Sequence, residues 1–344
     1  MLKPAVMSST FCFFAIFAFI LFSGYGLDTA ANLAEGLNVS KAYNNITNST
    51  FNQTLSTNDF NFAAAGDWGC NERAQRTVSN MQNKSPSLVL ALGDYSYEKN
   101  GECWLKMMSP LINKTRIVIG EHDFDENNYS RLQNYVNRFN LSDPFYSFNY
   151  RNVHFLALSS IIPFKNQSLQ FNVLQDDSRQ KEFVSNDLYA ASQNKSIDWI
   201  VVYVYRPMYT SPTVHPAREP LRDSYHPLFD MYGVDLVLQG HNHNYQRSYP
   251  MRYNATNSST PIITNAHVDS YDEPKAPIFM TVGTGGAEQY NFTGQAPYIV
   301  KQFDRFGFLN VNVADNGTKM VGTFYDNTQG TAKDQFTIKK VKVK

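Results

Sequence analysis

The sequence predicts an α/β fold with a largely parallel sheet core. Six apolar runs that do not alternate each end in a polar cluster, which is typical of strands buried on both faces: FNFAAAGD, SLVLALGD, RIVIGEHD, VHFLALSS, WIVVYVYRP and VDLVLQGH. Helix-compatible stretches lie between them at 72–82, 129–139 and 180–193. Alternating strands and helices indicate an α/β domain. Because such folds bind ligands at the carboxyl ends of their strands, the polar clusters predict a functional site there.

Composition divides the chain into three segments. Residues 1–27 contain the apolar run FCFFAIFAFILF, followed by small residues, and this pattern predicts a signal peptide. An uncleaved N-terminal anchor is the alternative, because residues 5–22 approach the length of a membrane span. Residues 28–58 are rich in Asn, Ser and Thr, which is typical of a flexible, glycosylated spacer. We expect residues 59–344 to form a single catalytic domain.

Sequons and charge indicate where the protein works and what it does not bind. Asn-x-Ser/Thr sequons are frequent, beginning at Asn38, Asn45, Asn48 and Asn52, and they predict an exported glycoprotein. The protein is therefore expected to be secreted or extracellular, with the N-terminal segment as its one possible link to a membrane. Its 30 basic and 30 acidic side chains balance, so no general attraction to nucleic acid is expected. The oligomeric state has no signal in the sequence.

Three cysteines occur, and Cys12 lies in the N-terminal apolar segment. Cys70 and Cys103 remain for the mature protein. An even pair in an oxidising compartment predicts a disulfide. Two unpaired buried thiols are the alternative.

Acidic, histidine and tyrosine side chains gather at the predicted strand ends. A single Asp after a strand is commonly a helix cap, and a single His is more often packed than a ligand. Capping does not require two histidines two residues apart together with carboxylates at three strand ends, so the set predicts a metal site. Its members are Asp67, Asp94, Tyr97, Glu121, His122, Tyr205, His241 and His243.

The ordered motifs resemble a known family. The chain has GDWG at 66–69, GDYSY at 93–97, GEHD at 120–123 and GHNHNYQRS at 240–248, with the glycine-rich VGTGGA at 282–287. This series is similar to that of the calcineurin-like metallophosphoesterases, and the GDxxY form is similar to that of purple acid phosphatases. The resemblance implies a four-layer α/β/β/α sandwich and a metal-dependent phosphomonoesterase that acts on small phosphate esters.

The resemblance also implies two metal positions. Asp67, Asp94, Tyr97 and His243 would form the first metal position, with Asp94 bridging both ions. His241 would bind the second metal. A phenolate is a good donor to Fe(III), so Tyr97 predicts Fe(III) at the first position. Two bridged metals can deprotonate a bound water and clamp a phosphoryl group, which predicts hydrolysis by a metal-activated hydroxide.

Two histidines are expected to contact the substrate instead of the metal. His122 matches the family histidine that contacts phosphate. His215 lies ten residues after Tyr205, a spacing similar to that of the histidine that assists the leaving group. The alternative for His215 is a surface histidine without a role.

Two residues depart from the family pattern at the second metal position, which comprises Asp94, Glu121, Tyr205 and His241. Glu121 stands where the family has Asn, and Tyr205 stands where it has His. More oxygen ligands would favour a cation harder than zinc, such as Fe(III), Mn or Mg. The resemblance itself leaves the second divalent metal open as Fe, Mn, Zn or Mg. Three outcomes are open. The site could be a working variant centre with two ions, or it could hold the first metal alone, with Glu121 acting as a base or forming a salt bridge with Arg206. The third outcome is phosphate binding without turnover.

Two further functions compete with the phosphomonoesterase. A non-catalytic surface protein would keep the fold and one metal to bind phosphate or a glycan. A phosphodiesterase would differ only in its substrate. The phosphomonoesterase is preferred, because all four residues of the first metal position match the motif pattern.

Overall fold

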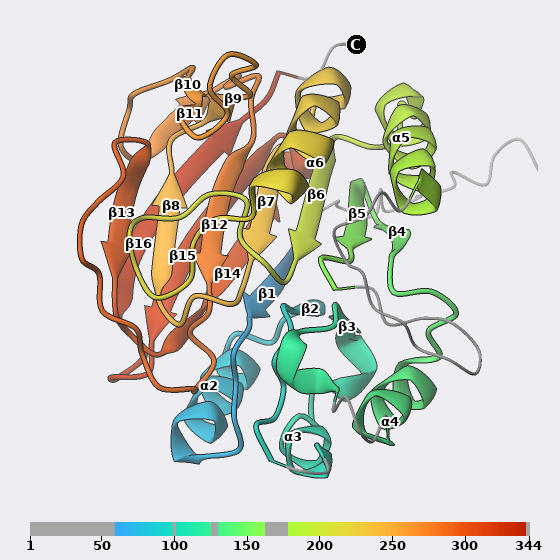
Figure 1. Ribbon diagram of the computed structural model, residues 1–344, viewed down its shortest axis with the longest axis vertical. Coiled ribbons are helices and arrows are strands. Elements are labelled where there is room, and N and C mark those ends of the chain that lie inside the picture. The colour runs from blue at the N-terminus through green and yellow to red at the C-terminus, as the bar shows by residue number, and fades with distance from the viewer. Residues whose placement is uncertain (1–58, 99–100, 125–129, 162–177, 342–344) are drawn as a thin grey trace, which may run out of the picture. The chain divides into compact units, whose positions relative to one another are not determined.

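The computed structural model describes residues 59–98, 101–124, 130–161 and 178–341, all within the unit Thr57–Lys344 (Figure 1). The expected signal peptide or anchor, the spacer and its sequons lie outside the described residues. None of the helices in these ranges has the length and hydropathy that a bilayer crossing needs.

The first of two seven-stranded sheets contains the N-terminal strands. Its order is β11-β16-β15-β14-β1-β2-β3. β1, β2 and β3 run parallel, whereas β14 pairs antiparallel with both β1 and β15, and β15 with β16. The strands are β1 (Phe60–Ala65), β2 (Leu88–Ala91), β3 (Thr115–Ile117), β11 (Ser270–Asp272), β14 (Gly307–Ala314), β15 (Lys319–Asp326) and β16 (Ala332–Lys339).

The second sheet has the order β13-β8-β12-β7-β6-β5-β4. β5, β6, β7 and β12 are parallel neighbours. β4 pairs antiparallel with β5, and β8 pairs antiparallel with both β12 and β13. The strands are β4 (Tyr146–Tyr150), β5 (Val153–Leu158), β6 (Trp199–Val204), β7 (Leu236–Gln239), β8 (Tyr245–Ser248), β12 (Ile278–Val282) and β13 (Ile299–Phe303). A short separate ribbon consists of β9 (Met251–Arg252) and β10 (Ile262–Ile263).

Helices pack on one face of each sheet, next to β1, β2 and β3 in the first sheet and next to β5, β6 and β7 in the second (Figure 1). Three of them, with residues such as Val78, Trp104 and Tyr135, pack on the first sheet. Two more pack on the second sheet through residues such as Leu188 and Phe229. The helices are α2 (Glu72–Asn83), α3 (Glu102–Met107), α4 (Ser130–Phe139), α5 (Ser178–Gln193) and α6 (Glu219–Tyr232), with 3₁₀ turns η1 (Ile112–Lys114), η2 (Glu121–Asp123) and η3 (Asp315–Gly317).

A third apolar cluster lies between the two sheets. Phe62 of β1 packs edge-on against Phe155 of β5, with ring centroids 5.3 Å apart. Both side chains are fully buried. Burial of such large aromatic side chains is the main force that holds the two sheets together. The layers are therefore helix, sheet, sheet and helix.

The four-layer sandwich predicted from the motifs is confirmed. Each of the six apolar runs forms a strand, and the three predicted helices match α2, α4 and α5 to within two residues. The expectation of a largely parallel core is only partly right, because three of the six runs lie in each sheet and antiparallel strands flank both parallel groups. The antiparallel strands come mainly from the C-terminal third of the chain.

Candidate metal centre

Loops at the carboxyl ends of β1, β2, β3, β6 and β7 carry the predicted site residues. Two of the hydrogen bonds that join these loops run from a backbone N–H to the carboxylate of a predicted metal ligand. The His241 N–H donates to Asp67 Oδ2 at 2.8 Å, which links a loop of the second sheet to a loop of the first. The His122 N–H donates to Asp94 Oδ1 at 2.8 Å. The carboxylates therefore fix the loops as well as offering ligand atoms.

Three of the site residues have a left-handed backbone, which is uncommon outside glycine. The φ angles are 56° at Asp67, 51° at Asp94 and 69° at His241. Each residue stands two or three residues after the end of a strand, where this conformation turns the chain sharply. Such conformations cost free energy and cluster at functional sites, where the surrounding structure holds them.

The first metal position brings its four residues together. Ligand atoms of Asp67, Asp94 and His243 all lie within 4.8 Å of one another, and these three side chains are buried. The Tyr97 hydroxyl lies 3.0 Å from His243 Nε2 and 3.4 Å from Asp94 Oδ2. Tyr97 is 38% exposed, so it stands at the rim of the group.

Two features of this position fit a cation. Asp67 Oδ1 is buried, and no described residue hydrogen-bonds to it. His243 Nδ1 donates to the Glu288 carbonyl at 2.7 Å. This bond leaves the lone pair on Nε2, which lies 3.5 Å from Asp67 Oδ1. An orphaned carboxylate oxygen beside a nitrogen lone pair suits a metal ion.

Burial also shifts the pKa values of these groups. It raises the pKa of Asp67 well above its usual value, and the nearby Asp94 carboxylate raises it further. Burial raises the pKa of Asp94 to about 6. Burial lowers the pKa of His243 to about 4, so its ring is neutral at pH 7. Two buried carboxylates are costly without a compensating charge, and a bound cation would supply one.

The second metal position also brings its residues together, but they contact one another. The Tyr205 hydroxyl donates to Asp94 Oδ2 at 2.6 Å and lies 2.8 Å from His241 Nδ1. Glu121 Oε1 lies 3.7 Å from His241 Nδ1, and Glu121 Oε2 pairs with Arg206 Nη2 at 2.8 Å. The ion pair between Glu121 and Arg206, which the sequence analysis considered as one of two roles for Glu121 in a centre with a single metal, is therefore present.

The two predicted substrate histidines lie at the rim of the centre. The His215 ring stacks on His241, with centroids 4.0 Å apart. The His122 ring is exposed, and its centroid lies 4.6 Å from that of Tyr97. His154 is buried and bonded to Asn149 and Asp187, as expected for a packed histidine.

Comparison with known proteins identifies the family of the chain. A family model described as calcineurin-like phosphoesterase matches residues 60–245, which is more than half of the chain. The chain belongs to the calcineurin-like phosphoesterase family. Purple acid phosphatase 23 from Arabidopsis thaliana is 23% identical over 296 residues, covering 74% of this chain and 59% of that protein. The chain spans about half the length of the curated relatives it matches.

Solved structures show the same fold. Purple acid phosphatase PPD1 from yellow lupin superposes with a TM-score of 0.68 at 19% identity, over 83% of this chain and 54% of that one. GAP50, described as the anchor in the inner membrane complex of Plasmodium, superposes with a TM-score of 0.59 at 16% identity, over 83% and 90% of the two chains. At these identities the likeness concerns the fold alone.

Asp123 is a positioning residue of this calcineurin-like centre that the sequence analysis did not assign. Its buried carboxylate accepts the N–H groups of Asp94 at 2.9 Å, Tyr95 at 2.7 Å and Gly120 at 2.7 Å. It thereby holds the loops after β2 and β3 together. Its place in the polar cluster GEHD was the available signal. Tyr290, whose ring stacks on His243 at 3.9 Å, had no signal in the sequence.

Two glycines let the family motifs pack closely. A Cβ on Gly120 would clash with Asp94 Oδ1, so the GEHD loop needs glycine beside the bridging carboxylate. A Cβ on Gly286 of VGTGGA would lie 2.6 Å from the Ala74 Cβ. The Gly286 N–H instead donates to the Asp67 carbonyl at 3.1 Å. Both glycines therefore bring the chain against a predicted metal ligand.

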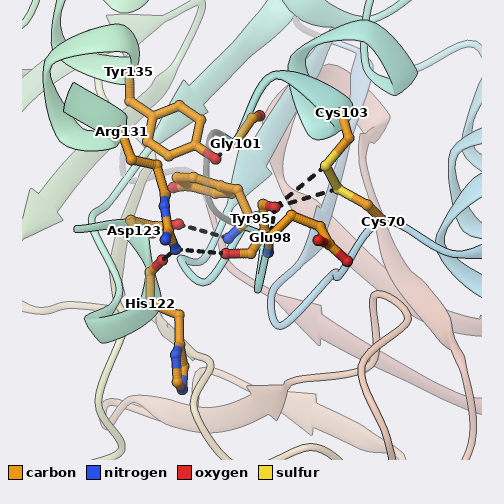
Figure 2. Close-up of a disulfide and its surroundings, with 10 residues drawn as sticks. Cys70, Tyr95, Glu98, Gly101, Cys103, His122, Asp123, Arg131 and Tyr135 are labelled. Atoms are coloured by element: carbon orange, nitrogen blue, oxygen red, sulfur yellow. Dashed lines mark hydrogen bonds between the residues drawn. A yellow bond between two sulfur atoms is a disulfide. The ribbon is translucent and has the colours of Figure 1, made fainter. Parts of the chain in front are cut away.

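The predicted disulfide between Cys70 and Cys103 is present. Figure 2 shows it on one side of the loop after β2, with Asp123 and Arg131 on the other. Ser96 Oγ lies 3.4 Å from Cys70 Sγ and 3.3 Å from Cys103 Sγ. Because Cys70 follows the Asp67 loop and Ser96 lies between Asp94 and Tyr97, the disulfide braces both loops of the first metal position.

Proposed function

We propose that this chain is a metal-dependent hydrolase of phosphate monoesters. The observation that carries the proposal is the convergence of four side chains at the first metal position, which are Asp67, Asp94, Tyr97 and His243. Among them, the buried Asp67 Oδ1 has no hydrogen-bond partner among the described residues. Hard oxygen donors, one of them a phenol, support Fe(III) as the ion at the first metal position. Family membership supports a phosphate ester as the substrate.

The chain's own residues supply the remaining chemistry. A metal bound here would polarise a phosphoryl oxygen and lower the pKa of a coordinated water. His122, whose exposed ring lies beside Tyr97, is the proposed donor of a hydrogen bond to a phosphate oxygen. His215, stacked on His241, is the proposed general acid that protonates the leaving oxygen. Burial lowers the pKa of His215. The Glu121 carboxylate raises this pKa, whereas Arg206 and His122 lower it further.

Three features support export of the protein. The N-terminal apolar segment and the sequons predict passage through a secretory pathway. The disulfide fits an oxidising compartment. We therefore propose a secreted or extracellular protein, with retention of residues 1–27 as an anchor being the alternative. Sequencing the mature N-terminus distinguishes the two.

Hydrolysis of p-nitrophenyl phosphate with added Fe, Mn, Zn or Mg tests the proposed activity. We expect turnover with at least one metal and a loss of about 10³-fold or more in Asp67→Asn, because a ligand is removed. Asp143→Asn is the matched control, since Asp143 forms an exposed ion pair with Arg179 away from the centre. Absence of turnover with every metal, in a folded protein that binds metal, would overturn the proposal.

The side-chain contacts at the second metal position favour one other function. Because Tyr205 and Glu121 engage Asp94, His241 and Arg206, the chain could keep phosphate binding without turnover, as a surface protein. Isothermal titration with inorganic phosphate separates this function from hydrolysis. Tight binding of phosphate by a metal-loaded protein that hydrolyses neither p-nitrophenyl phosphate nor bis-p-nitrophenyl phosphate would support it. Faster hydrolysis of the diester would instead indicate a phosphodiesterase.

A further inference from the structure

The two metal positions differ in where their histidines carry a proton. At the first position, His243 Nδ1 donates to a backbone carbonyl, so the lone pair of Nε2 faces Tyr97 and Asp67. At the second position, His241 turns Nδ1 toward Tyr205 and Glu121. Whether Nδ1 of His241 can bind a metal depends on the hydrogen bond it makes there.

The Tyr205 hydroxyl determines that hydrogen bond. A phenol has one proton, and Tyr205 donates it to Asp94 Oδ2, which as a carboxylate oxygen can only accept. The 2.8 Å contact with His241 must then have Nδ1–H as the donor and the phenol oxygen as the acceptor. A protonated ring nitrogen has no lone pair for a metal. The contact set Asp94, Tyr205 and His241 is therefore complete without an ion.

Glu121 is also engaged at this position. One of its oxygens pairs with Arg206 at 2.8 Å, in an ion pair whose side chains are 30% and 21% exposed. Arg206 thus supplies the positive charge that Glu121 would otherwise need from a cation. Among the described residues, the group of Asp, Glu, His or Cys side chains close enough to hold a metal ion consists of Asp67, Asp94 and His243, whose ligand atoms all lie within 4.8 Å of one another. Neither Glu121 nor His241 belongs to that group.

We propose that the protein binds one metal ion per chain, at the first metal position, and that the Tyr205 hydroxyl, bonded to Asp94 and His241, takes the place of a second ion. Purple acid phosphatase relatives imply a centre with two ions, so this chain would depart from them. The inference rests on the metal site of the proposed function. It does not depend on whether the site turns over substrate.

Metal content of the full chain tests the inference. Protein purified without chelators is equilibrated with excess Mn²⁺ or Fe²⁺, dialysed, and analysed by inductively coupled plasma mass spectrometry. We expect one ion per chain in the wild type and none in Asp67→Asn. Two ions in the wild type would mean that Glu121 and Tyr205 are ligands, and that result would overturn the inference, as would none.

Variants at Tyr205 test the cause. Tyr205→His together with Glu121→Asn removes the phenol and the extra carboxylate, and we expect the metal content to rise from one ion to two. Tyr205→Phe is the matched control, because it removes the hydroxyl without adding a ligand, and it should stay at one ion. If the double variant also stays at one, while circular dichroism shows it folded, Tyr205 is not what excludes the second ion and the inference fails.

Failure of this inference and failure of the proposed function give different results. One ion per chain without hydrolysis leaves the inference standing and overturns the hydrolase. Two ions per chain with hydrolysis does the reverse.

Discussion

Removal of the disulfide is expected to destabilise both the fold and the metal centre. Cys70 and Cys103 are separated by 33 residues. The bond between them closes a loop in the unfolded chain and so lowers the conformational entropy of the unfolded state. The chain-entropy relation gives about 4 kcal/mol for a loop of this length. Each kcal/mol shifts the melting temperature of a domain of this size by about 2 °C, so Cys70→Ser/Cys103→Ser should melt about 8 °C below the wild type.

The same variant is expected to bind metal more weakly. The disulfide braces the loops that carry Asp67 and Tyr97, and Ser96 contacts both sulfurs. Residues that support metal ligands from behind typically change metal affinity by 10-fold to 100-fold. We expect a loss of about 10-fold in the double serine variant.

Calorimetry and metal titration measure these effects on the same preparations. Wild-type protein reduced with dithiothreitol is the control, because it loses the bond but keeps the sulfur atoms. A melting temperature within about 2 °C of the wild type, with unchanged metal affinity, would show that packing around Tyr95 and Trp104 holds the loops without the disulfide. The reasoning from loop entropy would then be wrong for this protein.

Three further substitutions have definite expected outcomes. Tyr97→Phe should abolish the visible phenolate-to-iron absorption band of iron-loaded protein, and a band that persists would exclude Tyr97 as the ligand. Asp334→Asn should cost about 3–5 kcal/mol in urea unfolding by leaving Arg247 buried and unpaired. Burial raises the pKa of Asp334, but its bonds to Arg247 outweigh burial and lower the pKa below its usual value. The stability that the Asp334–Arg247 ion pair contributes is therefore full above about pH 4 and is lost as pH falls below that value. The difference between wild type and Asp334→Asn should therefore shrink in acid. Asp123→Asn should lower stability by about 2 kcal/mol and weaken metal binding, because an amide cannot accept all three backbone N–H groups, and an unchanged urea midpoint would contradict that role.

The buried parallel strands could be predicted from the sequence, but the strands around them could not. Fully buried strands such as WIVVYV have no polar residue to interrupt the run, so they were identified with nearly correct bounds. β16 alternates buried and exposed residues and has polar residues in the exposed places, so no apolar run marks it. The helix α6 contains Pro227, which also obscured its pattern.

The members of the centre could be predicted, but most of their contacts could not. Strand-end motifs predicted which residues gather, because parallel strands end at the same edge. The stacking of His215 on His241 and of Tyr290 on His243 joins residues from separate loops, and no local pattern encodes such contacts. The pairing of Glu121 with Arg206 was only one of two roles that the sequence left open for Glu121 in a centre with a single metal, since the choice depends on how two loops approach each other.

Anomalous diffraction from crystals grown with Mn²⁺ or iron tests the central claim most directly. The account predicts an anomalous peak bounded by Asp67, Asp94, Tyr97 and His243, with the Tyr205 side chain between Asp94 and His241. A metal-loaded crystal with no peak among those four side chains would contradict it.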